Sequence, residues 1–110
     1  MAFRQPGAGD LRHRVLFQTS ATAPAPGGGS STTWTDWHTA WAQVEGLTGV
    51  ERIQAMQTDS TLTHRITVRH NAGINPGMRA VIGGKVYNIA PPVDPEGRRR
   101  WLVMLVEEVG

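Results

Sequence analysis

The sequence predicts a mainly β fold, a small antiparallel β-barrel or sandwich of about six strands with one short helix and long Gly/Pro-rich loops. Two observations lead to this prediction. Apolar and polar residues alternate over several runs of strand length, and clusters of Gly, Pro and Asn separate those runs. The length of 110 residues fits one domain with one modest core, so we expect residues 1–110 to fold as a single unit.

The first expected strand follows a short arm. Residues 1–10 contain one proline and two glycines and offer little to bury, which predicts a flexible arm. Residues 11–18 alternate, with Val15 and Phe17 on one face, and predict a strand. Residues 19–33 hold three consecutive glycines, two prolines and many Ser and Thr residues, so we expect a long loop there.

The second expected strand, residues 34–45, is rich in tryptophan. Trp37 and Trp41 fall on one face of it, whereas Ala40 and Ala42 fall on the other. We expect the two tryptophans to fill the interior of the fold. The alternative is an exposed platform on which nucleic-acid bases stack, but such a platform needs cations, and this strand carries no Lys or Arg.

Residues 47–60 differ from the rest of the chain, because Val50, Ile53 and Met56 recur at every third position among polar residues. This spacing predicts a short, weakly amphipathic helix of about two turns, which is marginal alone and has to dock on the rest of the domain. Residues 61–70 return to strict alternation and predict a half-buried strand.

The C-terminal part of the sequence predicts a hairpin and a closing strand. Residues 78–82 and 85–89 flank a Gly-Gly pair, which is the signal of a two-residue turn. Residues 98–106 contain a strongly apolar run and are expected to form the last strand, with two glutamates following it.

Composition narrows the possible classes of protein. The chain has no cysteine, which excludes disulfides, thiolate metal sites and thiol catalysis. The N-terminus lacks the apolar run of a signal peptide and no stretch is long enough for a membrane span, so we expect a cytoplasmic protein without a membrane partner. The charged fraction of 18% is low against a usual value of about 25%. Either the loops are long, polar and uncharged, or the protein hides much of its surface against partners.

The remaining signals of chemistry are weak. Arginine accounts for ten of the eleven basic residues, yet the net charge is only +2, which does not by itself argue for nucleic-acid binding. The histidines lack the spacing of a metal site, no glycine-rich segment has the lysine of a phosphate-binding loop, and no nucleophile motif is present. We therefore expect no enzyme, no cofactor and no bound metal.

Several segments, taken in their order, carry a recognisable pattern. They are GDLRHRVLFQ at residues 9–18, WTDWHTAWAQVEGLTGVERIQA at residues 34–55, THRITVRH at residues 63–70 and MRAVIGGKVYNIAPPVD at residues 78–94, followed by WLVMLVEE at residues 101–108. With these segments the chain resembles the head–tail joining proteins of tailed bacteriophages, which are also called head-completion, stopper or head–tail connector proteins. The resemblance extends over nearly the whole chain.

The resemblance implies a structural subunit that acts after DNA packaging. Members of this family assemble as a closed ring, expected here to be six- or twelvefold, between a portal or adaptor ring above and a tail terminator or tail tube below. Double-stranded DNA passes through such a ring without sequence recognition, and the ring extends and closes the channel and docks the tail. The implied location is the neck of a virion or of a phage-like gene-transfer particle, assembled in the cytoplasm of the host bacterium.

The resemblance also points to candidate residues. In stopper members the segment between the second and third main strands closes the channel, and here that segment is residues 47–60. Its candidate gate residues are Gly49, Glu51, Arg52, Gln54 and Gln57. Alternatively, the apolar residues of the segment cap one end of the barrel. The arm at residues 1–10 and the loop at residues 19–33 would reach neighbouring subunits or the tail.

Charged residues supply a second set of candidates, for contacts between subunits or with partners. This set is Arg12, Arg14, Arg98, Arg99, Arg100, Glu107 and Glu108. The opposite charges of the three arginines at 98–100 and the two glutamates at 107–108 would attract each other across an interface. Alternatively, these residues form a solvated strand end.

Two other functions remain open. An oligonucleotide-binding β-barrel needs aromatic residues interleaved with cations on an exposed strand face, and residues 61–70 offer Arg65 and Arg69 only with threonines. A tail-completion or adaptor subunit of the same particle would have a related β fold and differ only in its partners.

Overall fold

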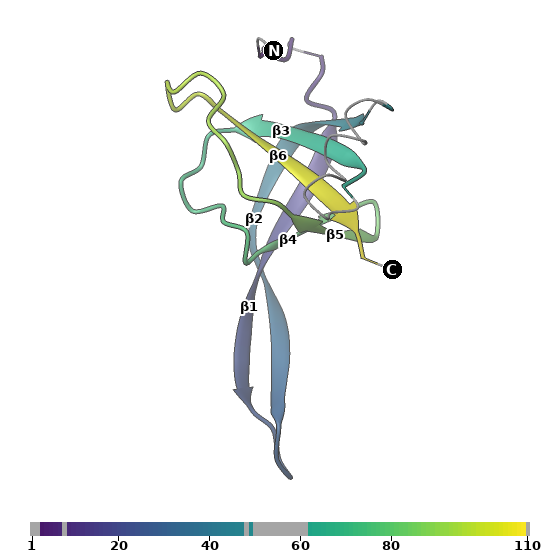
Figure 1. Cartoon of the computed structure of the whole chain (residues 1–110), viewed down its shortest axis with the longest axis vertical. Coiled ribbons are helices and arrows are strands. Elements are labelled where there is room, and N and C mark those ends of the chain that lie inside the picture. The colour runs from purple at the N-terminus through teal and green to yellow at the C-terminus, as the bar shows by residue number, and fades with distance from the viewer. Residues whose placement is uncertain (1–2, 8, 48, 50–61, 110) are drawn as a thin grey trace.

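The computed structural model describes residues 3–7, 9–47, 49 and 62–109, and these residues form a closed antiparallel β-barrel (Figure 1). The strands follow one another around the barrel in the order β1-β2-β3-β6-β5-β4, and β4 returns to β1. The strands are β1 (His13–Pro24), β2 (Ser30–Gly46), β3 (His64–Arg69), β4 (Arg79–Ile82), β5 (Lys85–Ile89) and β6 (Trp101–Glu108). The predicted mainly β barrel of six strands is confirmed, whereas the helix predicted within residues 47–60 lies almost wholly outside the described residues.

The core consists of inward side chains of all six strands and of two residues between β3 and β4. Alternation places Val15 and Phe17 inside, as the sequence predicts, and Ile66 and Val68 face them from β3, each with no exposed surface. Burial of side chains of this size contributes about 1.5–3 kcal/mol each. The other core residues are Ala42, Ile74, Met78, Ala80, Tyr87, Ile89, Leu102, Met104 and Val106.

The tight turn between β4 and β5 confirms the predicted hairpin. Ile82 pairs with Lys85, and the two residues between them are Gly83 at φ 56° and Gly84 at φ 82°. Two successive residues at positive φ define the turn whose twist matches that of the strands it joins, and glycine adopts this conformation without steric cost. The hairpin carries β5 to the edge of β6, which closes the sheet.

The prediction of a long loop at residues 19–33 is wrong, because most of this segment belongs to a β-hairpin. β1 and β2 remain paired from Thr19 opposite Thr35 to Pro24 opposite Ser30, and only residues 25–29 form the loop. Glycines at positions 27–29 have φ values of 86°, 103° and 75°, which turn the chain, and the threonines in both strands favour extended backbone. We call residues 19–35 the hairpin arm.

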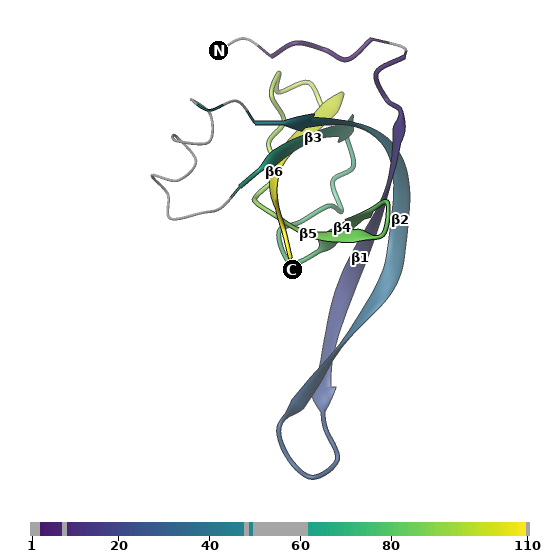
Figure 2. The same ribbon diagram turned by 90° about the vertical axis from the view of Figure 1, so that its right-hand side faces the viewer.

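The hairpin arm gives the molecule its elongated shape. The molecule measures 52 Å along its longest axis and 29 and 26 Å along the others. Figures 1 and 2 show the barrel at one end and the arm projecting from it as a twisted two-stranded ribbon, with the N-terminal residues at the opposite end. Every residue from Ser20 to Pro24 and from Ser30 to Thr33 is exposed.

The interior position predicted for Trp37 and Trp41 is also wrong. These side chains are 41% and 55% exposed, whereas Ala42 on the other face of β2 is fully buried. Trp41 lies opposite Arg14 of β1 on the outer wall, because the small alanine side chains are the ones that face the core. The tryptophan that is buried, at 2% exposure, is Trp101 at the start of β6, which begins three residues later than predicted.

Candidate assembly surfaces

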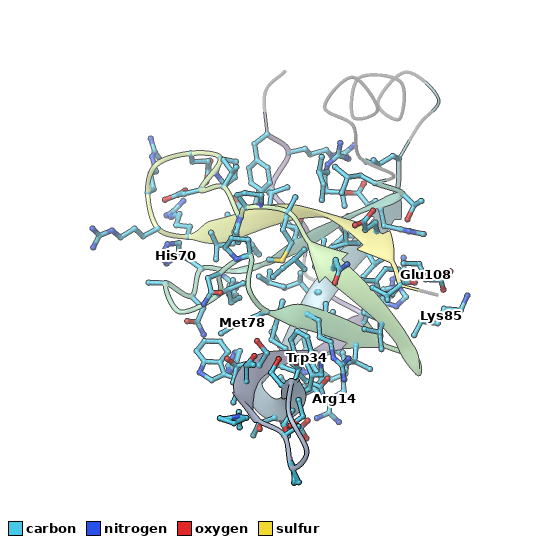
Figure 3. All side chains as sticks on the ribbon, turned by 60° about the horizontal axis from the view of Figure 1, so that its bottom comes forward. Arg14, Trp34, His70, Met78, Lys85 and Glu108 are labelled. Carbon is cyan, nitrogen blue, oxygen red and sulfur yellow. The ribbon has the colours of Figure 1, made fainter. Side chains whose placement is uncertain are left out.

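The base of the hairpin arm is held by side chains from three strands. Nε of Arg79 on β4 donates to Oε1 of Gln18 on β1 at 2.7 Å, and Nε2 of Gln18 donates to Oδ1 of Asp36 on β2 at 2.8 Å. The Arg79 guanidinium also lies 4.4 Å from the ring centroid of Trp34, which is a cation–π contact. Figure 3 shows Trp34 where the arm leaves the barrel. We call these four residues the base cluster, and they fix the direction of the arm.

The base cluster was not predicted from the sequence. Its members come from positions up to 61 residues apart, and β1 and β4 pair over only three residues, from Leu16 opposite Val81 to Gln18 opposite Arg79. Neither alternation nor a motif reports such a pairing. The signal closest to it is Arg79 itself, a charged residue that opens an otherwise apolar strand.

A β-bulge just above the base cluster turns Trp37 outward. The register between β1 and β2 shifts between Phe17 and Gln18, which leaves one extra residue on β2. The indole of Trp37 then lies on the turn at residues 71–77, where a Cβ built on Gly73 would come within 2.5 Å of its Cζ2 atom. A glycine at this position therefore allows the indole to pack on the backbone of the turn.

Arg14 and Trp41 form an exposed pair on the outer wall. They are cross-strand partners, and the guanidinium carbon of Arg14 lies 5.7 Å from the Trp41 ring centroid. Tryptophan and arginine are the residues that contribute most often to protein–protein binding energy, so this pair is a candidate contact. Arg12, the other candidate at this end of β1, is exposed as well. Their contact role stays a prediction.

A groove of 710 Å³ runs between the N-terminal segment and the outer face of β2, β3 and β6. Its floor includes Val103 and Leu105 of β6. Val93 also lines the groove and is 58% exposed, and its backbone N–H and C=O groups both hydrogen-bond to the backbone of Val103 at 2.9 Å. Thr67 lies on the outer face of β3, between β2 and β6, and yet its side chain is only 1% exposed. The N-terminal segment contributes Phe3, Arg4, Gln5 and Asp10 to the lining of this groove, and its flexibility stays a prediction.

One mouth of the barrel lies at Leu47, which begins the predicted gate segment in the sequence, and at Thr63, which follows it. The backbone N–H of Leu47 donates to the carbonyl of Thr63 at 2.9 Å, so the two ends of the intervening segment lie side by side. A pocket of 360 Å³ lies at this mouth and includes His64 and Tyr87, whose rings meet edge to face at 5.9 Å. Of the candidate gate residues, Gly49 is exposed, and Glu51, Arg52, Gln54 and Gln57 lie outside the described residues.

The basic loop before β6 is ordered by one carboxylate. Oδ1 of Asp94 accepts from the N–H of Gly97 at 2.9 Å and Oδ2 accepts from the N–H of Arg99 at 2.8 Å. The hydrogen bond from Arg99 is the main cause that lowers the pKa of Asp94 below 3.8, with that from Gly97 adding to it. Arg99 has a φ of 56°, so the same carboxylate holds a non-glycine residue in the left-handed region.

The predicted basic and acidic contact residues lie at opposite ends of β6. Arg98, Arg99 and Arg100 are exposed and precede the strand, whereas Glu107 and Glu108 end it. Six residues of strand, 101–106, at about 3.3 Å each separate the two sets, so they do not meet within one chain. Glu108 forms an ion pair with Lys85 at 3.5 Å instead. The backbone N–H of His70 donates to the backbone carbonyl of Arg100, and Figure 3 shows His70 across the barrel from the Lys85–Glu108 pair.

Two further features concern metal binding and membrane insertion. Over residues 3–7, 9–47, 49 and 62–109, no three His, Asp or Glu side chains gather closely enough to hold a metal ion. The same part of the chain contains no helix with the length and apolar character needed to cross a membrane. His64 packs on Tyr87 and hydrogen-bonds to the Thr63 hydroxyl at 2.8 Å.

Comparison with known proteins gives consistent matches over nearly the whole chain. The model of the phage head completion protein family matches residues 6–109. The head completion protein gp7 of Enterobacteria phage HK97 is 30% identical over 91 residues, which cover 77% of this chain and 81% of gp7. The solution structure of protein SF1141 from Shigella flexneri 2a has a TM-score of 0.75 at 31% identity, with 94% of this chain and 96% of that one covered.

A further structure shares the fold alone. A chain in the virion of a native gene transfer agent particle has a TM-score of 0.59 at 18% identity, with 89% of this chain and 96% of that one covered.

Proposed function

The chain belongs to the phage head completion protein family, and from this premise we propose that it is a ring-forming head–tail connector subunit that closes the DNA channel as a stopper. The observation that carries the proposal is the family match over residues 6–109, which includes the whole barrel and the hairpin arm. Members of a family of structural phage proteins act by assembly, so the functional features to look for are contact surfaces.

The proposed ring would lie in the neck of a phage or phage-like gene-transfer particle. A portal or adaptor ring would lie above it, a tail terminator or tail tube below it, and double-stranded DNA would pass through without sequence recognition. Closed rings need heterologous contacts, in which two different surfaces of each subunit meet. The exposed pair Arg14–Trp41, the groove under the N-terminal segment and the hairpin arm are different surfaces of this kind.

The proposed gate is the segment that joins β2 to β3, residues 47–60. Support comes from its ends, because the Leu47–Thr63 hydrogen bond ties both to one mouth of the barrel. A segment anchored in this way can change position without opening the barrel. The competing role, a cap on the barrel end, predicts that removing the segment would destabilise the fold.

Deletion of the gene in the particle that produces the protein tests the proposal. Electron microscopy is expected to show separate tails beside tailless heads, many of which have lost their DNA, and restoring the protein should restore joined particles. Labelling the restored protein separates the connector from an adaptor or tail-completion subunit, because the label should lie between the portal and the tail. Normally joined, DNA-filled particles in the deletion would overturn the connector function.

One observation favours a second function, an oligonucleotide-binding barrel. Arg14 and Trp41 bring a cation and an aromatic ring together on an exposed face, although the cation comes from the neighbouring strand. Titration of the free subunit with single-stranded DNA at two salt concentrations tests it. Tight binding that weakens steeply with salt, and that is lost in Trp41→Ala, would support this function. The connector proposal expects no such binding.

A further inference from the structure

The hairpin arm has two strand edges that no other described strand covers. β1 pairs with β4 only over residues 16–18, and β2 pairs with β3 only over residues 42–46. Beyond those contacts, residues 19–24 pair only with residues 30–35 within the part of the chain that the structure describes, and residues 36–41 pair only with residues 14–18 of β1. At alternate residues each edge therefore presents backbone N–H and C=O groups that are free to bind another strand.

These edges lack the usual protection against strand pairing. Natural edge strands are commonly blocked by lysine, by other charged residues or by proline. Residues 19–35 contain no charged residue, and their two prolines lie near the tip, at positions 24 and 26. Along the rest of the arm both faces carry mainly Ser, Thr and Ala, so small side chains permit the close approach of a further strand. Such edges are suited to β-strand addition.

The chain directions of the two edges make them complementary to each other. β1 runs from the barrel toward the tip of the arm, and β2 runs back. When two copies stand side by side with their arms pointing the same way, the β1 edge of one copy faces the β2 edge of the next. The two strands then run antiparallel, as they do within each hairpin. Each copy uses two different edges, so the contact is heterologous and repeats around a closed ring.

The base cluster favours this contact energetically. Arg79, Gln18, Asp36 and Trp34 hold the arm at one angle to the barrel before any partner is present. A pre-oriented arm loses less conformational entropy on association than a loop would, which leaves more of the hydrogen-bond energy for binding.

We propose that neighbouring copies of this chain join through their hairpin arms, with residues 19–24 of one copy hydrogen-bonded to residues 30–35 of the next. The arms then form one continuous antiparallel sheet around the ring, with two strands from each subunit. This inference rests on the proposed ring function and names the contact that builds the ring.

The absence of native cysteine allows a clean test by disulfide trapping. Thr22→Cys is produced together with each of six single-cysteine variants at residues 30–35, in the particle that assembles the protein, and the particles are oxidised mildly. A disulfide forms when the two Cα atoms come within about 4.4–6.8 Å. We expect at least one mixture to give a disulfide-linked dimer on a non-reducing gel, whereas every variant alone stays monomeric on the gel.

Two controls make the outcome specific. Asn88→Cys is exposed but lies on β5, which is paired on both sides, so mixtures of it with Thr22→Cys should give no dimer. Dimers from Thr22→Cys alone would mean that two β1 edges meet, and this outcome would overturn the head-to-tail arrangement. Absence of dimers across the whole panel, or a disulfide to a different protein, would overturn the pairing between copies.

A second variant separates this inference from the proposed function. The double substitution Ser20→Lys and Thr33→Lys places charge on both edges, outside the barrel, and should leave the unfolding temperature of the barrel unchanged. We expect at least a tenfold loss of joined particles. If joining is normal with these lysines but is lost on gene deletion, the connector function stands and the arm pairing is wrong. If deletion itself leaves joined particles, the connector function is wrong.

Discussion

Arg79 and Gln18 lie 61 residues apart in the sequence, yet Nε of Arg79 donates a 2.7 Å hydrogen bond to Oε1 of Gln18. This bond closes the sheet where β1 leaves the barrel, because the same two residues are the last pair between β1 and β4. The barrel and the hairpin arm are therefore mechanically joined at this point.

Removal of the Arg79 side chain should loosen the arm and weaken the barrel. Arg79→Ala removes the hydrogen bond and the cation–π contact with Trp34 together, and we expect a loss of about 1–2 kcal/mol in the free energy of unfolding. Urea denaturation measures it. Arg12→Ala, an exposed arginine outside this cluster, is the matched control and should change stability by less than about 0.5 kcal/mol. Equal effects of the two substitutions would contradict the structural role of the cluster.

The contact between Trp37 and Gly73 predicts a clash that a second substitution relieves. Gly73→Ala puts a methyl group 2.5 Å from Cζ2 of Trp37, so the indole has to move, and we expect a destabilisation of about 1–3 kcal/mol. In the Trp37→Ala background the same substitution should cost less than about 0.5 kcal/mol. Gly46→Ala, which meets no atom within 4 Å, is the control. A cost at Gly73 that persists without Trp37 would show that the turn itself excludes a side chain.

The loop at residues 94–100 should lose its order in acid. Because hydrogen bonds to the carboxylate lower the pKa of Asp94 in the folded protein, the carboxylate stabilises the loop above pH 3.8, and this contribution disappears as the pH falls through the lower folded pKa. The amide resonances of Gly97 and Arg99 report it in NMR spectra. We expect both to titrate together below pH 3.8 in the native chain and to be insensitive in Asp94→Asn. Glu96→Gln should leave the titration in place, and a midpoint above 3.8 would contradict the assignment.

The sequence allowed prediction of those parts of the fold whose signals are local. Alternation around Val15 and Phe17 placed the core face of β1, and the Gly83–Gly84 pair placed the β4–β5 turn. The arm was missed because its Ser, Thr and Ala residues are exposed on both faces and so carry no apolar period, although its strands pair along their whole length.

The orientation of the tryptophans and the base cluster depends on information that no local pattern contains. Ala40 and Ala42 are as compatible with the core as Trp37 and Trp41 are, and a bulge between Phe17 and Gln18 decides how β2 turns. The pairing of β1 with β4 arises only when the barrel closes. Contact residues of a structural subunit are harder still to predict, because no sequence motif distinguishes an exposed arginine or glutamate that binds a partner from one that only contacts solvent.

The paired ends of the segment between β2 and β3 allow the gate and the cap roles to be separated. Because the N–H of Leu47 and the carbonyl of Thr63 are already 2.9 Å apart, a short Gly-Ser linker can replace residues 48–62 without straining the barrel. A shorter loop costs less closure entropy, so the unfolding temperature of this variant should equal or exceed that of the native chain. Calorimetry of the purified subunit measures this temperature.

In the assembled particle the same variant should join heads to tails and yet lose the packaged DNA, since the barrel and the arm remain while the gate is gone. Electron microscopy counts DNA-filled heads among joined particles, and particles with the native protein are the reference. A variant that unfolds at a lower temperature would favour the cap role for this segment, because only a cap contributes its apolar residues to the barrel end. Stable, joined and DNA-filled particles would mean that another element closes the channel.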